Sequence, residues 1–217
     1  MNKKEPAQPQ FDLDDLIAPD NFIKAAETED ELGCVLRMHL CLERLLDKFL
    51  KEMVHKDHKK YHPQRTQFGG KLSLAVAYGL NLSIAEAIYI INQIRNKFAH
   101  SGDTSLSECD LNNLANLVDL VPILPPKEEP PVRSIHIELC KARPGERLIF
   151  GKNGSRIDFV IICSSLLRRS SLWMVVEYVR RNPELINNHQ IKKKNKRPYD
   201  TPYNPPHQYS SCKNSKT

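Results

Sequence analysis

Proline is missing from the middle of this 217-residue sequence, because all 15 prolines lie before residue 64 or after residue 121. A proline inside a helix removes a backbone hydrogen bond, so the proline-free stretch can form long helices. The six cysteines include no C-x-x-C pair and no zinc-type spacing. Most of them lie among apolar residues, which predicts buried, reduced thiols in a reducing compartment.

The sequence also lacks the features of secreted and membrane proteins. Its N-terminus, MNKKEPAQPQFDLDDL, contains no apolar core of a signal peptide. No run approaches the roughly 18 apolar residues of a membrane span. These absences predict a soluble, cytoplasmic protein without a membrane partner.

Metal-ligating and cofactor-binding motifs are equally sparse. The segment HKDHKKYH, residues 55–62, is rich in histidine. A metal site needs ligands that are held by a fixed backbone and by further hydrogen bonds, and a charged, solvated loop explains this segment more simply. We therefore expect no metal and no cofactor.

Positive charge is concentrated at the C-terminal end. The formal net charge is +6, and residues 182–217 carry seven Lys or Arg but only two acidic residues. This polar segment predicts a disordered tail. Its basic residues could hold nucleic acid while neighbouring tyrosines stack on bases, and a solvated, unbound tail is the alternative. The candidate nucleic-acid-binding residues are Lys192, Lys193, Lys194, Lys196 and Arg197.

Three capping-box patterns divide the proline-free region into helices. In each pattern a Ser or Thr precedes a Glu by three residues, and an apolar run of helical period follows. The spacing predicts a helical bundle over residues 28–121, with breaks near 55–69, 80–83 and 101–107. His39 lies on the apolar stripe of the first helix, where a core histidine is the simpler interpretation. The capping pairs are Thr28 with Glu31, Ser83 with Glu86, and Ser105 with Glu108.

The flanking regions are assigned from composition and pattern. Residues 1–27 form a polar N-terminal arm, and residues 122–131 form a proline-rich linker. SIHIEL alternates like a strand, and ERLIFGKNGSRIDFVIIC could form a hairpin around KNG. We prefer one helix over residues 155–181, packed on the bundle. The expected fold is all-α, a bundle over residues 28–181 with a disordered basic tail, 182–217.

Two segments of the chain resemble a known family. LRMHLCLERLLDKFL and FGGKLSLAVAYGLNLSIAEAIYIINQIRNKFAH are similar, in order and pattern, to the bacterial mannitol operon repressor family of the HEPN superfamily. The resemblance covers residues 28–121. It implies an HEPN-like bundle and a regulatory protein without a helix-turn-helix, which binds a protein or a nucleic acid, RNA or DNA. The chain departs from the family in HKDHKKYH, in RPGERLIFGKNGSR and in its basic tail.

The ending IRNKFAH resembles the motif of HEPN ribonucleases, which falls here on Arg95, Asn96 and His100. The motif implies metal-independent RNA cleavage through a cyclic phosphate. His100 would be the general acid or base, Arg95 would stabilise the transition state and Asn96 would orient the phosphate. On a straight helix Arg95 and His100 lie about 140° and 7.5 Å apart. The nuclease interpretation therefore predicts a loosened helix end or a homodimer with facing motifs.

A structural interpretation of the same stretch stays open. Lys97 and His100 would complement the negative end of the helix dipole, and Gly102 would end the helix in the left-handed conformation. Arg95 would pair with Glu43 on the first helix and fix the register of the bundle. A regulatory function is our first hypothesis, and an endoribonuclease is the alternative.

Overall fold

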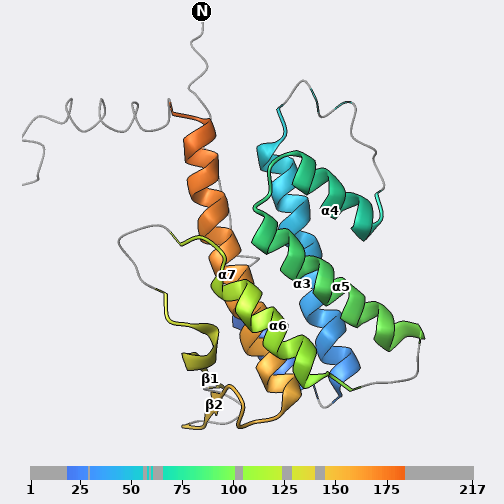
Figure 1. The fold of residues 1–217 in the computed structure, drawn as a ribbon, viewed down its shortest axis with the longest axis vertical. Coiled ribbons are helices and arrows are strands. Elements are labelled where there is room, and N and C mark those ends of the chain that lie inside the picture. The colour runs from blue at the N-terminus through green and yellow to red at the C-terminus, as the bar shows by residue number, and fades with distance from the viewer. Residues whose placement is uncertain are drawn as a thin grey trace, which may run out of the picture. The chain divides into compact units, whose positions relative to one another are not determined.

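Helices account for most of the described chain in the computed structural model (Figure 1). The structure describes residues 19–28, 30–55, 58, 60, 66–100, 105–123, 129–139 and 145–183. Within these ranges the only sheet is a two-stranded hairpin, so the expected all-α helical bundle is confirmed. The elements are α2 (Pro19–Glu27), α3 (Glu31–Met53), α4 (Phe68–Ala77), α5 (Leu82–His100), α6 (Glu108–Asp119), the 3-10 turn η2 (Val132–Ser134), β1 (His136–Glu138), β2 (Arg147–Ile149) and α7 (Ser155–Arg181).

The helices begin at capping residues other than the expected ones. Asp30 caps α3 and Ser107 caps α6, each by accepting a hydrogen bond from a backbone amide. The Asn81 side chain accepts hydrogen bonds from two amides at the start of α5. Each cap lies two residues from the predicted one, because Asp, Asn and Ser are similarly good acceptors at this position. The helices are confirmed, and the three predicted capping boxes are wrong in position.

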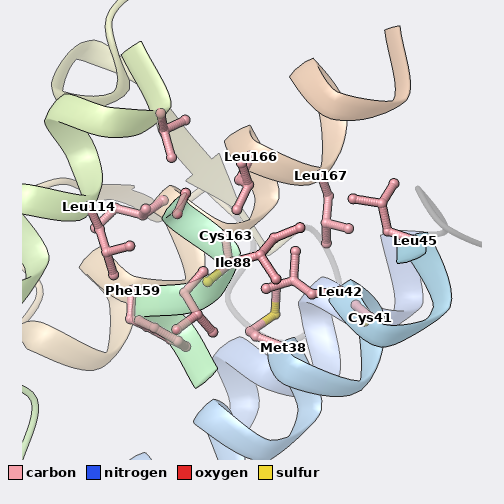
Figure 2. Packing of buried hydrophobic residues seen from close by; sticks show 14 of the residues in the cluster. Met38, Cys41, Leu42, Leu45, Ile88, Leu114, Phe159, Cys163, Leu166 and Leu167 are labelled. Atoms are coloured by element: carbon pink, nitrogen blue, oxygen red, sulfur yellow. The ribbon is translucent and has the colours of Figure 1, made fainter. Parts of the chain in front are cut away.

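The core lies between α3, α5, α6 and α7 (Figure 2). Each of the first three helices buries one stripe at three- and four-residue spacing. The inner helix is α7, which is buried on nearly all sides between Ile157 and Leu167. The core residues labelled in Figure 2 are Met38, Cys41, Leu42, Leu45, Ile88, Leu114, Phe159, Cys163, Leu166 and Leu167.

Three cysteines are buried, as their apolar surroundings predict. Cys34, Cys41 and Cys163 are free thiols in the core, whereas Cys109 is exposed on α6. Burial raises the pKa of Cys34 to about 12, and burial also raises the pKa values of Cys41 and Cys163. The three buried thiols therefore stay protonated and unreactive at neutral pH.

The expected polar N-terminal arm contains a packed helix, α2, at residues 19–27. Ala25 and Ala26 of α2 are buried in the core, and Phe22 packs against it. Arg156 of α7 donates hydrogen bonds to the carbonyls of Ala26 and Thr28. The arm assignment is wrong for this segment, because two small alanines give a weak hydrophobic signal although they allow close helix packing. Residues 1–18 lie outside the described part of the chain.

Glu31 joins three segments instead of completing a capping box on its own helix. Its carboxylate accepts a hydrogen bond from the Leu106 amide at 2.6 Å. It also accepts a hydrogen bond from the hydroxyl of Ser155, the first residue of α7. The starts of α3 and α7 and the segment before α6 are therefore tied through one charged acceptor.

The region between the linker and α7 contains the hairpin that the sequence left open. β1 and β2 are antiparallel, with Ile137 opposite Leu148. KNG lies after β2 rather than between two strands, where Gly151 and Gly154 adopt φ values of 75° and 87°. Such left-handed angles favour glycine, so the chain can turn here into α7. The preferred helix over 155–181 is confirmed, and the hairpin around KNG is wrong.

By length and apolar composition, α7 is the one helix in the described ranges that could cross a membrane. The expectation that no segment spans a membrane relies on the absence of an unbroken apolar run of about 18 residues. However, 67% of the most apolar part of α7 is buried inside the bundle. The core helix of a soluble protein has the same composition, so α7 is weak evidence for a membrane span.

Arg169 fixes the proline-rich linker to the core. Its side chain is only 2% exposed and donates hydrogen bonds to the carbonyls of Val118 and Pro130 at 2.9 and 2.8 Å. It also donates to the Asp119 carboxylate at 3.0 Å, and the same carboxylate oxygen accepts from the Val132 amide. One buried guanidinium thus links the end of α6, the end of the linker and α7.

The expected disordered tail begins close to a structural boundary. The chain divides into two compact units, Met1–Tyr178 and Val179–Thr217. In the second unit the structure describes residues 179–183, which contain the end of α7. The candidate nucleic-acid-binding residues Lys192, Lys193, Lys194, Lys196 and Arg197 lie outside the described residues.

Arg169→Met should lower the free energy of unfolding by about 3 kcal/mol, because it removes one partner of a buried charge pair. We expect a loss at the lower end of the range for a broken buried ion pair. Asp119 is partly exposed and still accepts a hydrogen bond from the Val132 amide. Urea denaturation measures the difference. Arg44→Met, at an exposed position of α3, is the control and should change stability by at most about 0.5 kcal/mol. Equal losses in the two variants would contradict this role of Arg169.

Candidate functional site

A polar seam lies where α3, α4 and α5 meet, and we define it by His39, Phe68, Asn92, Arg95 and Asn96. His39 of α3 is buried, and its Nε2 lies 3.1 Å from Oδ1 of Asn92 on α5. Its ring packs against Phe68 of α4, with 4.1 Å between the ring centroids. The interpretation of His39 as a satisfied core histidine is confirmed.

Arg95 lies in the same seam and has an unsatisfied donor. Its side chain is half-buried, and Nη1 donates to Oδ1 of Asn96 at 3.0 Å. Its Nε is buried without a hydrogen-bond partner. The guanidinium is therefore held by one neutral amide, with no hydrogen bond to an acidic side chain among the described residues. A permanently charged group in this state can accept an anionic partner.

The predicted pair between Arg95 and Glu43 is wrong. Glu43 instead contacts Lys71 of α4, whose Nζ lies 2.8 Å from Glu43 Oε1 and 2.9 Å from the Asp47 carboxylate. Burial lowers the pKa of Lys71, but the hydrogen bonds that its ammonium donates to Asp47 and Glu43 outweigh this effect and leave the pKa raised. The flexible Lys71 stem reaches two carboxylates at once, which favours it over Arg95 as their partner.

His100 lies at the exposed C-terminal end of α5, away from the seam. The helix is continuous from Leu82 to His100, so the loosened helix end that the nuclease interpretation allowed is not present. Five residues along a regular helix turn the side-chain direction by about 140° and rise about 7.5 Å. The structure therefore brings Arg95 and Asn96 together and does not bring His100 to them within one chain.

The interpretation of Lys97 and His100 as structural residues at the end of α5 is supported in part. Lys97 lies in the last turn of α5, and its Nζ is 3.1 Å from the Asp110 carboxylate on α6. The His100 side chain makes no hydrogen bond or ion pair within the described ranges, although the negative end of the helix dipole favours a cation there. Gly102 lies outside the described residues.

The electrostatics of the seam keep His39 neutral. Burial is the main cause that lowers the pKa of His39, and the nearby Arg95 cation lowers it further. The hydrogen bond to Asn92 and the Glu43 carboxylate act in the opposite direction without cancelling the shift. The neutral imidazole is buried and already contacts Asn92, so Arg95 rather than His39 is the candidate to bind a ligand.

Sequence reasoning missed that His39 and Asn92 share a site with Arg95. A signal was present, because Asn92, Arg95 and Asn96 recur at positions i, i+3 and i+4 of one helix and therefore share a face. These polar residues interrupt an otherwise apolar side of α5 and meet the one histidine of the α3 stripe. A polar stripe facing a core histidine could have indicated the seam.

Exposed apolar residues lie on α3 and α5, two of the three helices that form the seam. Leu40 of α3 is 54% exposed and Tyr89 of α5 is 48% exposed. Leu36 lies one turn before Leu40 on the same side of α3 and is also exposed. We call Leu36, Leu40 and Tyr89 the α3–α5 surface.

No group of three His, Cys, Asp or Glu side chains among the described residues could hold a metal ion. Of the histidine-rich segment, residues 56, 57, 59, 61 and 62 are not described. His55 and His58 lie with their ring centroids 5.6 Å apart.

Comparisons with known proteins add no relative. The chain matches no protein-family model, no curated protein and no solved structure.

Stability should fall as the pH drops below about 6.5, the ordinary pKa of histidine. Because burial lowers the pKa of His39 in the folded chain, the unfolded chain binds the proton first and unfolding is favoured. His39→Gln keeps a polar group beside Asn92. In urea denaturation, this variant should lose less free energy of unfolding than the wild type between pH 7.5 and 5.5. His58→Gln, at an exposed position, should leave this loss unchanged. The account fails if His39→Gln keeps the full pH dependence of the wild type.

Proposed function

We propose that this chain is a helical regulatory protein of the mannitol-repressor type, with an HEPN-like bundle, which acts in the cytoplasm by binding a protein or nucleic-acid partner. The observation that carries the proposal is the continuity of α5 to His100. A single chain with this helix has Arg95 and His100 pointing apart, so it lacks an assembled cleavage site. Binding of a partner does not require Arg95 and His100 to lie close together.

The α3–α5 surface supports a binding function. Leu36, Leu40 and Tyr89 are exposed large apolar side chains on α3 and α5, the helices that also carry His39 and Arg95. Exposed apolar residues that gather beside polar ones are typical of partner-binding surfaces, and tyrosine is enriched there. If the partner is RNA or DNA, the basic residues Lys192, Lys193, Lys194, Lys196 and Arg197 would add salt-dependent affinity.

Capture of a partner on the immobilised protein tests this proposal. Leu40→Lys should reduce capture at least about tenfold, because it places a charge in the apolar centre of the α3–α5 surface. Leu172→Lys is the matched control, since Leu172 is 47% exposed on α7 and should be neutral. Mass spectrometry and nuclease treatment of the eluate identify a protein or a nucleic acid. Equal capture by both variants would overturn the role of this surface.

A metal-independent endoribonuclease is the second candidate, and the unsatisfied Nε of Arg95 favours it. A guanidinium without an acidic hydrogen-bond partner can bind a phosphate and stabilise its transition state. His100 would have to come from a second chain, so this candidate requires a homodimer. Asn96, which is bonded to Arg95, would then orient the phosphate or the guanidinium.

Labelled RNA in a buffer with EDTA distinguishes the two candidates. The regulatory proposal expects no cleavage by the wild type. The nuclease candidate expects cleavage that Arg95→Ala and His100→Ala each abolish, while Gln93→Ala, at an exposed position of α5, retains it. In that case an equimolar mixture of the two inactive variants should regain activity, because a mixed dimer holds one intact composite site. Cleavage with this pattern would reject the regulatory proposal in favour of the nuclease.

A further inference from the structure

The hairpin has a free strand edge. β1 pairs with β2 on one side, with His136 opposite Ile149 and Glu138 opposite Arg147. Within the described ranges no strand lies on the other side of β1. A free edge presents unpaired N–H and C=O groups in a row, so it can pair with a further strand. β1 is therefore a possible site of strand addition.

A groove of about 460 Å³ opens beside this strand. One wall is formed by β1 and the residues just before it, and the floor includes Ser164 and Ser165 of α7. Both serine hydroxyls already donate to the Ile161 carbonyl, so the floor does not require a polar ligand. Ile137 and Phe22 add apolar area. The groove can therefore receive an apolar side chain of an added strand.

The strand sequence is complementary to itself. Residues 135–139 read Ile-His-Ile-Glu-Leu. In an antiparallel pair of two copies related by a two-fold axis at Ile137, His136 of each copy faces Glu138 of the other. Ile137 then faces Ile137 of the other copy. Opposite charges and apolar pairs in these cross-strand positions stabilise a sheet.

We propose that β1 pairs with β1 of a second copy, antiparallel and centred on Ile137, to form a four-stranded sheet across a homodimer. On the outer face, Glu138 lies 2.9 Å from Arg147 and 3.7 Å from His136 of its own chain, and its side chain is 44% exposed. In the dimer, a protonated His136 of the second copy lies opposite Glu138 and adds to these contacts. On the inner face, Ile137 of the second copy enters the groove above Ser164 and Ser165.

The size of the contact sets its strength. A standard stable interface buries about 1,600 Å² in total, and one short strand pair with one filled groove is smaller than that. We therefore expect a reversible dimer whose population rises with protein concentration. This surface is separate from the α3–α5 surface, and the proposal is independent of the proposed function.

Sedimentation velocity over a concentration series tests the charge pairing. His136→Glu places like charges opposite each other twice and should weaken self-association about tenfold. His136→Lys keeps the opposite charges and should retain the dimer. Lys152→Gln is the control, because it also removes one positive charge at an exposed position of the hairpin region without facing the second copy. Circular dichroism verifies that each variant is folded.

Cross-linking tests the register. Ile137→Cys should form a disulfide-linked dimer with oxidised glutathione, because the two residues lie directly opposite at the two-fold axis. The wild type, which has Cys109 exposed, is the control for cross-linking through native cysteines. The proposal is overturned if a dimer exists but Ile137→Cys forms no disulfide and His136→Glu does not weaken the dimer. Such a dimer uses another surface. A chain that stays monomeric at every concentration also overturns the proposal.

Discussion

The regular course of α5 is the constraint on which the site depends. Because α5 is an α-helix from Leu82 to His100, the direction of every side chain on it is fixed by the 3.6-residue period. Asn92 contacts His39, and Arg95 lies close enough to lower the pKa of His39. His100 lies farther along the helix, exposed to solvent. The same helix therefore creates a polar seam and separates the two residues that a nuclease would need together.

The elements around α5 hold the seam in place. α4 contacts α3 through the charges of Lys71, Glu43 and Asp47, and through the ring contact of Phe68 with His39. At the other end, Glu31 ties the start of α3 to the segment before α6 and to α7. These contacts join α3 to α4, to α7 and to the segment before α6.

The apolar period predicted the main helices, because burial of one stripe dominates the stability of a helix in a bundle. It failed at α2, whose packing relies on Ala25 and Ala26, and at the helix caps, where several acceptors lie close together. The resemblance to the HEPN ribonuclease motif points to Arg95, Asn96 and His100, but nothing in the sequence indicates the partner of Glu43. Lys71 is distant from Glu43 in sequence, and only the docking of α4 brings the two charges to 2.8 Å.

The central claim is that α5 stays helical through His100 and keeps Arg95 and His100 apart. NMR measurement of the ¹³Cα chemical shifts and amide-exchange rates of residues 92–100 tests it most directly. The account predicts helical shifts at every position up to His100, with protection that decreases only in the last turn. A break in the helical shifts between Asn96 and His100 would contradict the account, because it would allow the two side chains to converge within one chain.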